Sequence, residues 1–142
     1  MFKNIQIRPD EDGTRVALYD LEADIMDVVW SHAWAFFSVR DVLEELRKSR
    51  SIAYTTVMTT VSRLYDKGLL EREMEGRRYI YSPVADRDEF QARVALEVMS
   101  SLPDGGREVA MSMLIDQMSR EDTGALERLE RLIAEHTKNI DT

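Results

Sequence analysis

Side chains that carry hydroxyl groups crowd one short segment of this sequence. Five of the eight residues from Thr55 to Ser62 are threonine or serine. These residue types are poor choices for a helix that needs only stability, because they lose side-chain freedom or compete for backbone hydrogen bonds. Their hydroxyls can, however, bond base edges and phosphates, and a threonine methyl can contact the methyl group of thymine. The segment therefore has the chemistry needed to read a DNA groove.

Basic residues gather in the same part of the chain, although the 142 residues together carry a formal net charge of −8. Residues 47–84 hold eight Lys and Arg against four Asp and Glu, a local net charge of +4, whereas residues 17–46 and 85–142 each carry −6. A basic patch inside an acidic protein marks a local binding surface rather than a property of the whole molecule.

Three helices are predicted to position the hydroxyl-rich segment. The first begins at Asp20, where apolar residues start to recur at helical spacing. The second opens at Ser38, whose spacing to Asp41 has the form of a capping box. The third runs from about Tyr54 to Lys67 and stops before Gly68, because glycine is the residue that commonly follows a helix end.

A β-hairpin is predicted after the third helix, from the alternating segment LLEREMEGRRYIYSPV. Three helices and a hairpin over residues 17–84 make a winged helix-turn-helix, and Arg77 and Arg78 follow the hairpin tip. We therefore expect a mainly α fold with a small β-hairpin wing. Residues 1–16 are polar and aperiodic, and we expect a mobile tail there.

The third helix is predicted to enter the major groove, where short side chains allow close approach. Arg63 and Lys67 would then add charge beside the DNA backbone, and the two wing arginines could reach a minor groove or phosphate. Tyr54 stays ambiguous, as either a packing residue or a base contact. The residues predicted from this reasoning to bind DNA are Thr55, Thr56, Thr59, Arg63, Lys67, Arg77 and Arg78.

Residues 85–142 predict three more helices, separated by PDGG at residues 103–106 and by a capping box from Ser119 to Asp122. Fewer than 60 residues bury too little surface to be stable alone, which favours a helical dimerisation region. A two-fold dimer would place two recognition helices about one DNA turn apart. The alternative is that these helices fold back on their own winged helix. The expected interface residues are Phe90, Val94, Val98, Met111, Leu114, Leu126, Leu129 and Ile133.

Other function classes find little support in the sequence. No cysteine is present, which excludes disulfides and thiolate chemistry. His32 and His136 lie outside any metal-ligand spacing, and no nucleophile–base pair or phosphate loop is present. No apolar run approaches the roughly 20 residues that span a bilayer, and the N-terminus lacks the apolar core of a signal peptide. We expect a cytoplasmic protein that is not an enzyme and uses no metal or cofactor.

The sequence resembles the penicillinase-repressor family of the BlaI/MecI type over about residues 18–135. The segments that carry the resemblance are LEADIMDVVW, SVRDVLEEL and AYTTVMTTVSRLYDKGLLEREMEGRRYIYSPV. It implies a dimeric winged-helix repressor on short inverted repeats in promoters, for example those of antibiotic-resistance or β-lactamase-type genes. By position it adds Tyr54 and Met58 to the residues of the third helix that read DNA.

Two departures from the family leave the inducing signal open. In β-lactam-sensing members a sensor-linked protease cuts an Asn-Phe bond in the fifth helix, and the matching pair here is Met113-Leu114. This pair is the candidate proteolysis position, and a membrane-bound sensor protease is a candidate partner. Copper-responsive relatives carry C-terminal cysteine pairs, which this chain lacks. The acidic net charge also keeps an alternative open, a winged helix that binds protein instead of DNA.

Overall fold

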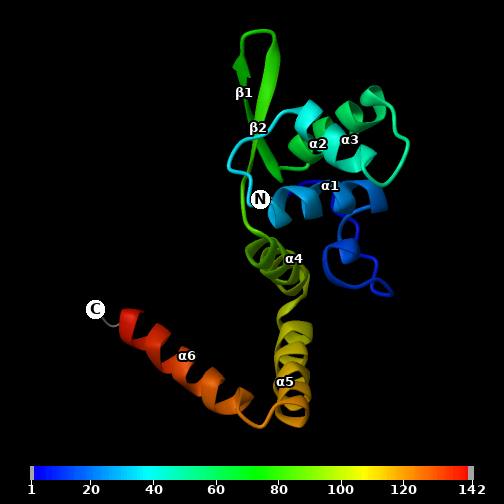
Figure 1. The fold of residues 1–142 in the computed structure, drawn as a ribbon. Helices are drawn as coiled ribbons and strands as arrows, with labels where there is room; N and C mark the ends of the chain where they lie inside the picture. The colour runs from blue at the N-terminus through cyan, green and yellow to red at the C-terminus, as the bar shows by residue number, and fades with distance from the viewer. Residues whose placement is uncertain (1, 141–142) are drawn as a thin grey trace. The chain divides into compact units, whose positions relative to one another are not determined.

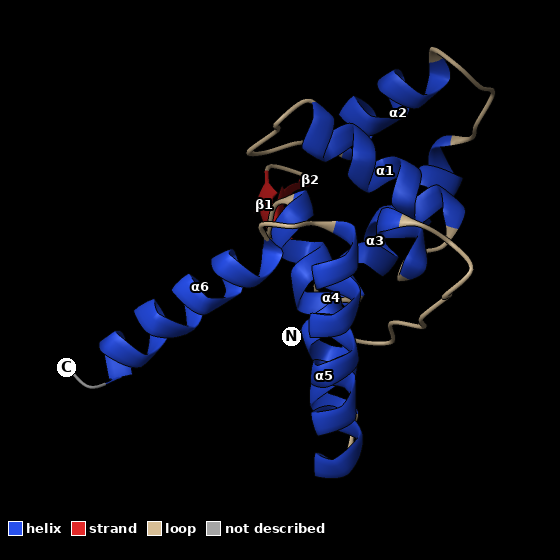
Figure 2. Cartoon of the chain, turned by 90° about the horizontal axis from the view of Figure 1, so that it is seen from below, coloured by secondary structure: helices blue, strands red, loops and turns tan. Residues whose placement is uncertain are grey.

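The computed structural model describes residues 2–140, which form six α-helices and one two-stranded hairpin after a short 3-10 turn (Figures 1 and 2). The elements are η1 (Gly13–Val16), α1 (Asp20–Ser31), α2 (Val39–Arg47), α3 (Tyr54–Asp66), β1 (Leu70–Glu75), β2 (Arg78–Pro83), α4 (Arg87–Ser101), α5 (Asp104–Glu121) and α6 (Ala125–Ile140). They belong to two compact units, an N-terminal unit up to Val94 and a C-terminal unit from Ala95. The predicted fold class, mainly α with a hairpin wing, is confirmed.

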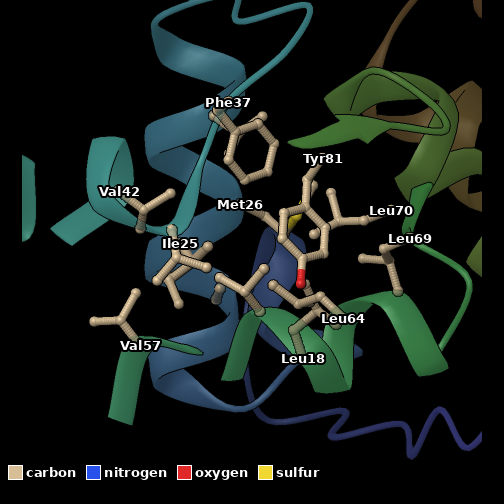
Figure 3. Close-up of a cluster of buried hydrophobic side chains, with 14 of the residues drawn as sticks. Leu18, Ile25, Met26, Phe37, Val42, Val57, Leu64, Leu69, Leu70 and Tyr81 are labelled. Atoms are coloured by element: carbon tan, nitrogen blue, oxygen red, sulfur yellow. The ribbon is translucent and has the colours of Figure 1, made fainter. Parts of the chain in front are cut away.

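The N-terminal unit is a winged helix whose core lies between α1, α2, α3 and the base of the hairpin. Figure 3 shows Met26, Leu64, Leu70 and Tyr81, from four different elements, gathered in this core. Phe37, in the connection before α2, is buried beside them. Its backbone exchanges two hydrogen bonds with Tyr81, of 2.9 and 2.8 Å, so the connection pairs with the base of the β1–β2 wing.

Local signals fix the ends of α2 and α3 where the sequence predicts them. Ser38 Oγ accepts a hydrogen bond from the backbone N of Asp41 at 3.2 Å, and the Asp41 carboxylate accepts one from the backbone N of Ser38 at 2.8 Å. This capping box satisfies two backbone donors at the start of α2. Helix α3 ends at Asp66, and Gly68 follows with a φ of 86°, which suits a residue without a Cβ atom.

The N-terminal segment, predicted as a mobile tail over residues 1–16, packs against the N-terminal unit over the residues described. The Phe2 ring meets the Phe90 ring edge-on, with centroids 5.0 Å apart. The backbone N of Lys3 donates a hydrogen bond to the carbonyl of Lys67 at 2.8 Å. The described part of this segment therefore lies against the unit through single apolar and backbone contacts, which a search for periodic patterns does not reveal.

Helix α4 begins inside the N-terminal unit. Phe90 and Val94, predicted at the dimer interface, are only 1% and 7% exposed and lie in the winged-helix core, where the Trp30 ring is 5.6 Å from Phe90. These two residues are therefore not available to a partner chain. The compact unit ends after Val94 rather than after residue 84. The fold-back alternative thus holds for the first half of α4, because its apolar stripe is covered by the same chain.

The C-terminal unit contains the rest of α4, α5 and α6. Residues 103–106, predicted to separate two helices, supply the N-cap and first turn of α5. Ser119, predicted to open the last helix, instead lies inside α5 with its hydroxyl donating to the carbonyl of Asp116 at 2.8 Å. The capping-box prediction was wrong because a serine inside a helix can bond back to its own preceding turn.

The turn between α5 and α6 is built around Asp122, whose carboxylate accepts hydrogen bonds from the Arg128 guanidinium and, at 2.9 Å, from the backbone N of Gly124. These two donors hold the pKa of Asp122 below its usual value. Ala125, the first residue of α6, is buried at this turn. The turn therefore fixes where α6 starts.

Candidate nucleic-acid interface

Helix α3 separates a buried face from an exposed one. The buried residues are Val57, Thr60, Val61 and Leu64. The exposed residues include all six positions of the helix that the sequence assigns to DNA: Tyr54, Thr55, Thr56, Met58, Thr59 and Arg63. A helix that enters a groove needs such a free face, so the packing of α3 leaves the predicted residues accessible.

Threonine hydroxyls on α3 bond back to the helix and so limit what they can offer to DNA. Thr59 Oγ1 donates to the carbonyl of Thr55 at 2.8 Å, and Thr60 Oγ1 donates to the carbonyl of Thr56 at 2.9 Å. A hydroxyl that already donates its hydrogen keeps its lone pairs and acts as an acceptor. Thr59 is therefore suited to a base-edge donor, such as the amino group of adenine or cytosine, or to the thymine methyl.

The exposed face of α3 and the wing share a concave surface of about 240 Å³, which we call the α3–wing hollow. Its lining residues are Ser38, Val39, Arg40, Tyr54, Met58, Arg77, Arg78, Tyr79 and Tyr81. Four residues predicted to bind DNA, two from α3 and two from the wing, thus border one surface. The fold brings together groups that are about 20 positions apart in the sequence.

Two exposed residues of the hollow, Arg40 and Tyr79, are absent from the sequence prediction. Arg40 is exposed in the first turn of α2, beside the wing arginines in the lining of the hollow. It is the single Lys or Arg among residues 17–46, and that isolation is the signal that could have pointed to it. Tyr79 is 41% exposed on β2. Its alternation with Tyr81 indicates a strand and carries no sign of a binding role.

Lys67, predicted to contact DNA, is turned toward the interior. Its Nζ lies 2.8 Å from Glu22 Oε1 of α1, and the two side chains are 12% and 3% exposed. The same Nζ lies 5.0 Å from the centroid of the Tyr19 ring. The sequence predicts Lys67 as the last residue of the helix, beside the DNA backbone, but α3 ends at Asp66 and a buried carboxylate needs a counter-charge. Lys67 is therefore not available to a phosphate.

Arg72 of β1 is held between two tyrosine rings. Its guanidinium carbon lies 3.8 Å from the ring centroid of Tyr65 on α3 and 4.1 Å from that of Tyr79 on β2. Burial opposes the charge, but hydrogen bonding to Tyr81 and the charge interactions with the two flanking tyrosines outweigh it and raise the pKa of Arg72. An arginine side chain is a cation at physiological pH in any case, and here it lies among aromatic rings.

Comparison with known proteins identifies the family. The family model named penicillinase repressor matches residues 18–135. The transcriptional regulator BlaI of Mycobacterium tuberculosis is 36% identical over 112 residues, which are 78% of this chain and 80% of that protein. The chain belongs to the penicillinase repressor family.

A second relative and one solved structure match about half of the chain. The penicillinase repressor of Bacillus licheniformis is 32% identical over 71 residues, which are 50% of this chain and 54% of that protein. A solution structure of the monomeric form of Bacillus licheniformis BlaI with the blaP half-operator is 32% identical, with a TM-score of 0.42, and covers 51% of this chain and 85% of that chain.

Two further features bear on the sequence predictions. Within residues 2–140, no three or more histidine, aspartate or glutamate side chains gather closely enough to hold a metal ion. Among the helices of the same residues, none has the length and apolar character needed to cross a bilayer.

Proposed function

We propose that this member of the penicillinase repressor family represses transcription in the cytoplasm by binding, as a homodimer, to inverted-repeat operators in promoters. The observation that supports DNA binding is the α3–wing hollow, where Tyr54 and Met58 face the same surface as Arg77 and Arg78. Short side chains on α3 suit a major groove, and arginine suits phosphate or the narrower minor groove. The family to which the chain belongs supports the repressor role.

Dimerisation is supported by apolar side chains that the chain itself leaves uncovered. Those of the predicted interface that stay exposed, each by 41% or more, are Val98, Met111, Leu114, Leu126 and Ile133. In Figure 1, α5 and α6 meet at their connecting turn and then diverge, so each leaves much of its surface open. Exposed apolar patches of this kind mark surfaces that associate with another protein. A second copy of the chain would cover them symmetrically.

The dimer can be tested on α6. Replacement of Ile133, which is 57% exposed, by aspartate should convert the dimer into a monomer, because a carboxylate cannot be buried in an apolar interface without a partner. Sedimentation equilibrium measures the change. Ala134→Asp is the matched control, since it adds the same charge one residue along, away from the apolar stripe, and should remain dimeric. A dimeric Ile133→Asp variant would contradict the proposal.

DNA binding can be tested by gel-shift titration against the chain's own promoter region. The double change Thr56→Ala/Arg63→Ala should weaken operator binding at least tenfold, because each base or phosphate contact contributes about 1–3 kcal/mol. The slope of log affinity against log salt concentration should fall by about one unit for the lost phosphate contact. The matched control, Arg93→Ala/Ser100→Ala on α4, removes the same kinds of groups away from α3 and the wing and should bind as the wild type does.

The same titration distinguishes the alternative function, a winged helix that binds protein instead of DNA. That function predicts no salt-dependent affinity for any duplex, in keeping with a net charge of −8. Operator binding that survives the double change unaltered would remove α3 from the DNA interface. Operator binding that is lost with the double change, and kept in the control, supports the repressor proposal.

A sensor-linked protease is included among the proposed partners. Met113 and Leu114, at the candidate proteolysis position, are 67% and 55% exposed on α5 in the single chain. Their side chains are therefore accessible before association. Because Leu114 also belongs to the proposed dimer interface, association and cleavage would compete for this part of α5.

A further inference from the structure

The outer half of the wing lacks a third strand to support it. Phe37 pairs with Tyr81 at the base of the wing, and the hairpin continues beyond this bridge to its turn. Met74 and Tyr79, opposite each other in the outer half, are 59% and 41% exposed. A two-stranded hairpin is only marginally stable by itself. The position of the wing tip relative to α3 therefore depends on side chains that join the hairpin to the helix.

Arg72 makes such a connection with three elements at once. It projects from β1, and its guanidinium carbon lies 3.8 Å from the Tyr65 ring on α3 and 4.1 Å from the Tyr79 ring on β2. Tyr79 in turn lines the α3–wing hollow together with Met58 and Arg77. One continuous series of contacts thus runs from the helix, through the arginine, to the surface proposed to meet DNA.

We propose that Arg72 is a positioning residue for operator recognition: stacked between Tyr65 and Tyr79, it sets the angle of the wing against α3. The inference rests on the DNA binding proposed above. At this angle of the wing, the wing arginines and the hydroxyls of α3 can contact the same DNA site at the same time. Arginine is needed because a planar guanidinium can lie flat between two rings, whereas an ammonium group cannot stack in this way.

The proposed role has a specific consequence for affinity. Non-specific binding depends on the number of phosphates neutralised, whereas operator binding also requires contacts to be made in the correct geometry. The guanidinium of Arg72 is engaged by the two rings and is not assigned to a phosphate. Loss of the stack should therefore weaken operator binding while leaving binding to unrelated DNA, and the salt dependence, unchanged.

The experiment compares Arg72→Lys with Arg78→Ala in the full-length chain, on operator DNA and on an unrelated duplex of equal length. Arg72→Lys should lose about tenfold in operator affinity, because an ammonium group cannot stack flat between both rings and so holds the wing less firmly, with an unchanged salt slope. Its affinity for the unrelated duplex should equal that of the wild type. Arg78→Ala, an exposed wing residue, should instead weaken binding to both duplexes and lower the salt slope by about one unit.

Tyr65 tests the same stack from the helix side. Tyr65→Leu should repeat the loss of operator affinity, and Tyr65→Phe, which keeps the ring, should not. A general loss of folding would lower both affinities alike, and a thermal melt by circular dichroism would record it. Operator affinity unchanged in Arg72→Lys or Tyr65→Leu would overturn the inference, as would a reduced salt slope in Arg72→Lys. If the wild type binds no operator, the proposed function itself fails before the variants are compared.

Discussion

Replacing Lys67 with alanine should lower the free energy of unfolding of the N-terminal unit by about 3–5 kcal/mol, the usual result when one partner of a buried ion pair is removed. Glu22 is only 3% exposed, and its Oε1 accepts from the Lys67 ammonium at 2.8 Å and from the backbone N of Tyr19 at 3.0 Å. Its Oε2 has no hydrogen-bond partner among the described residues. Without the lysine, the buried carboxylate of Glu22 would keep only one hydrogen-bond donor, the backbone N of Tyr19.

Urea unfolding followed by tryptophan fluorescence measures this effect, because Trp30 and Trp34 both lie in the N-terminal unit. The matched control is Lys48→Ala, since Lys48 is 71% exposed and pairs with Glu45 at 2.7 Å. Exposed pairs contribute about 0–1 kcal/mol, so the control should be nearly neutral. A Lys67→Ala variant no less stable than this control would show that the pair is not buried in solution.

The second large effect is expected at Phe90, where alanine should cost about 3–5 kcal/mol because a buried aromatic side chain leaves a cavity that neighbours only partly fill. Phe90 is 1% exposed, with the Phe2 and Trp30 rings 5.0 and 5.6 Å from it. Removal of its ring should therefore loosen the start of α4 and the N-terminal segment together. The same urea titration reports the loss.

Leu96→Ala is the control for Phe90→Ala, because Leu96 lies on the same helix and is 55% exposed. It should change the free energy of unfolding of the N-terminal unit little. Sedimentation of both variants separates the two roles considered for Phe90. A Phe90→Ala variant that unfolds like the wild type but dissociates into monomers would restore Phe90 to the dimer interface and contradict the core assignment.

The elements that the sequence predicts well are those with signals inside a few residues. The capping box of Ser38 and Asp41 and the glycine at position 68 place the ends of α2 and α3, since both depend on local hydrogen bonds and backbone angles. The stripe of Phe90 and Val94 is equally visible in the sequence. The surface that covers this stripe cannot be predicted from the sequence. An apolar stripe shows that one face of a helix is buried, but not whether the same chain or a partner chain buries it.

In the candidate site, too, local features are predicted well and contacts between distant residues are not. Helical periodicity alone separates the exposed Thr55 and Thr59 from the buried Val57. Lys67 breaks the pattern, because a long side chain at a helix end can reach a distant carboxylate. The stack of Arg72 joins residues from three elements, so it exists only once the wing has folded against α3.

The contact between Phe2 and Phe90 has a consequence for how related chains can diverge. Phe2 precedes the region shared with the family, residues 18–135, whereas Phe90 lies inside it. The two rings share one space, so a change in the size of either must be offset at the other. Among related chains, we expect the residue at position 2, outside the range matched by the family model, to covary with the residue at position 90, inside it.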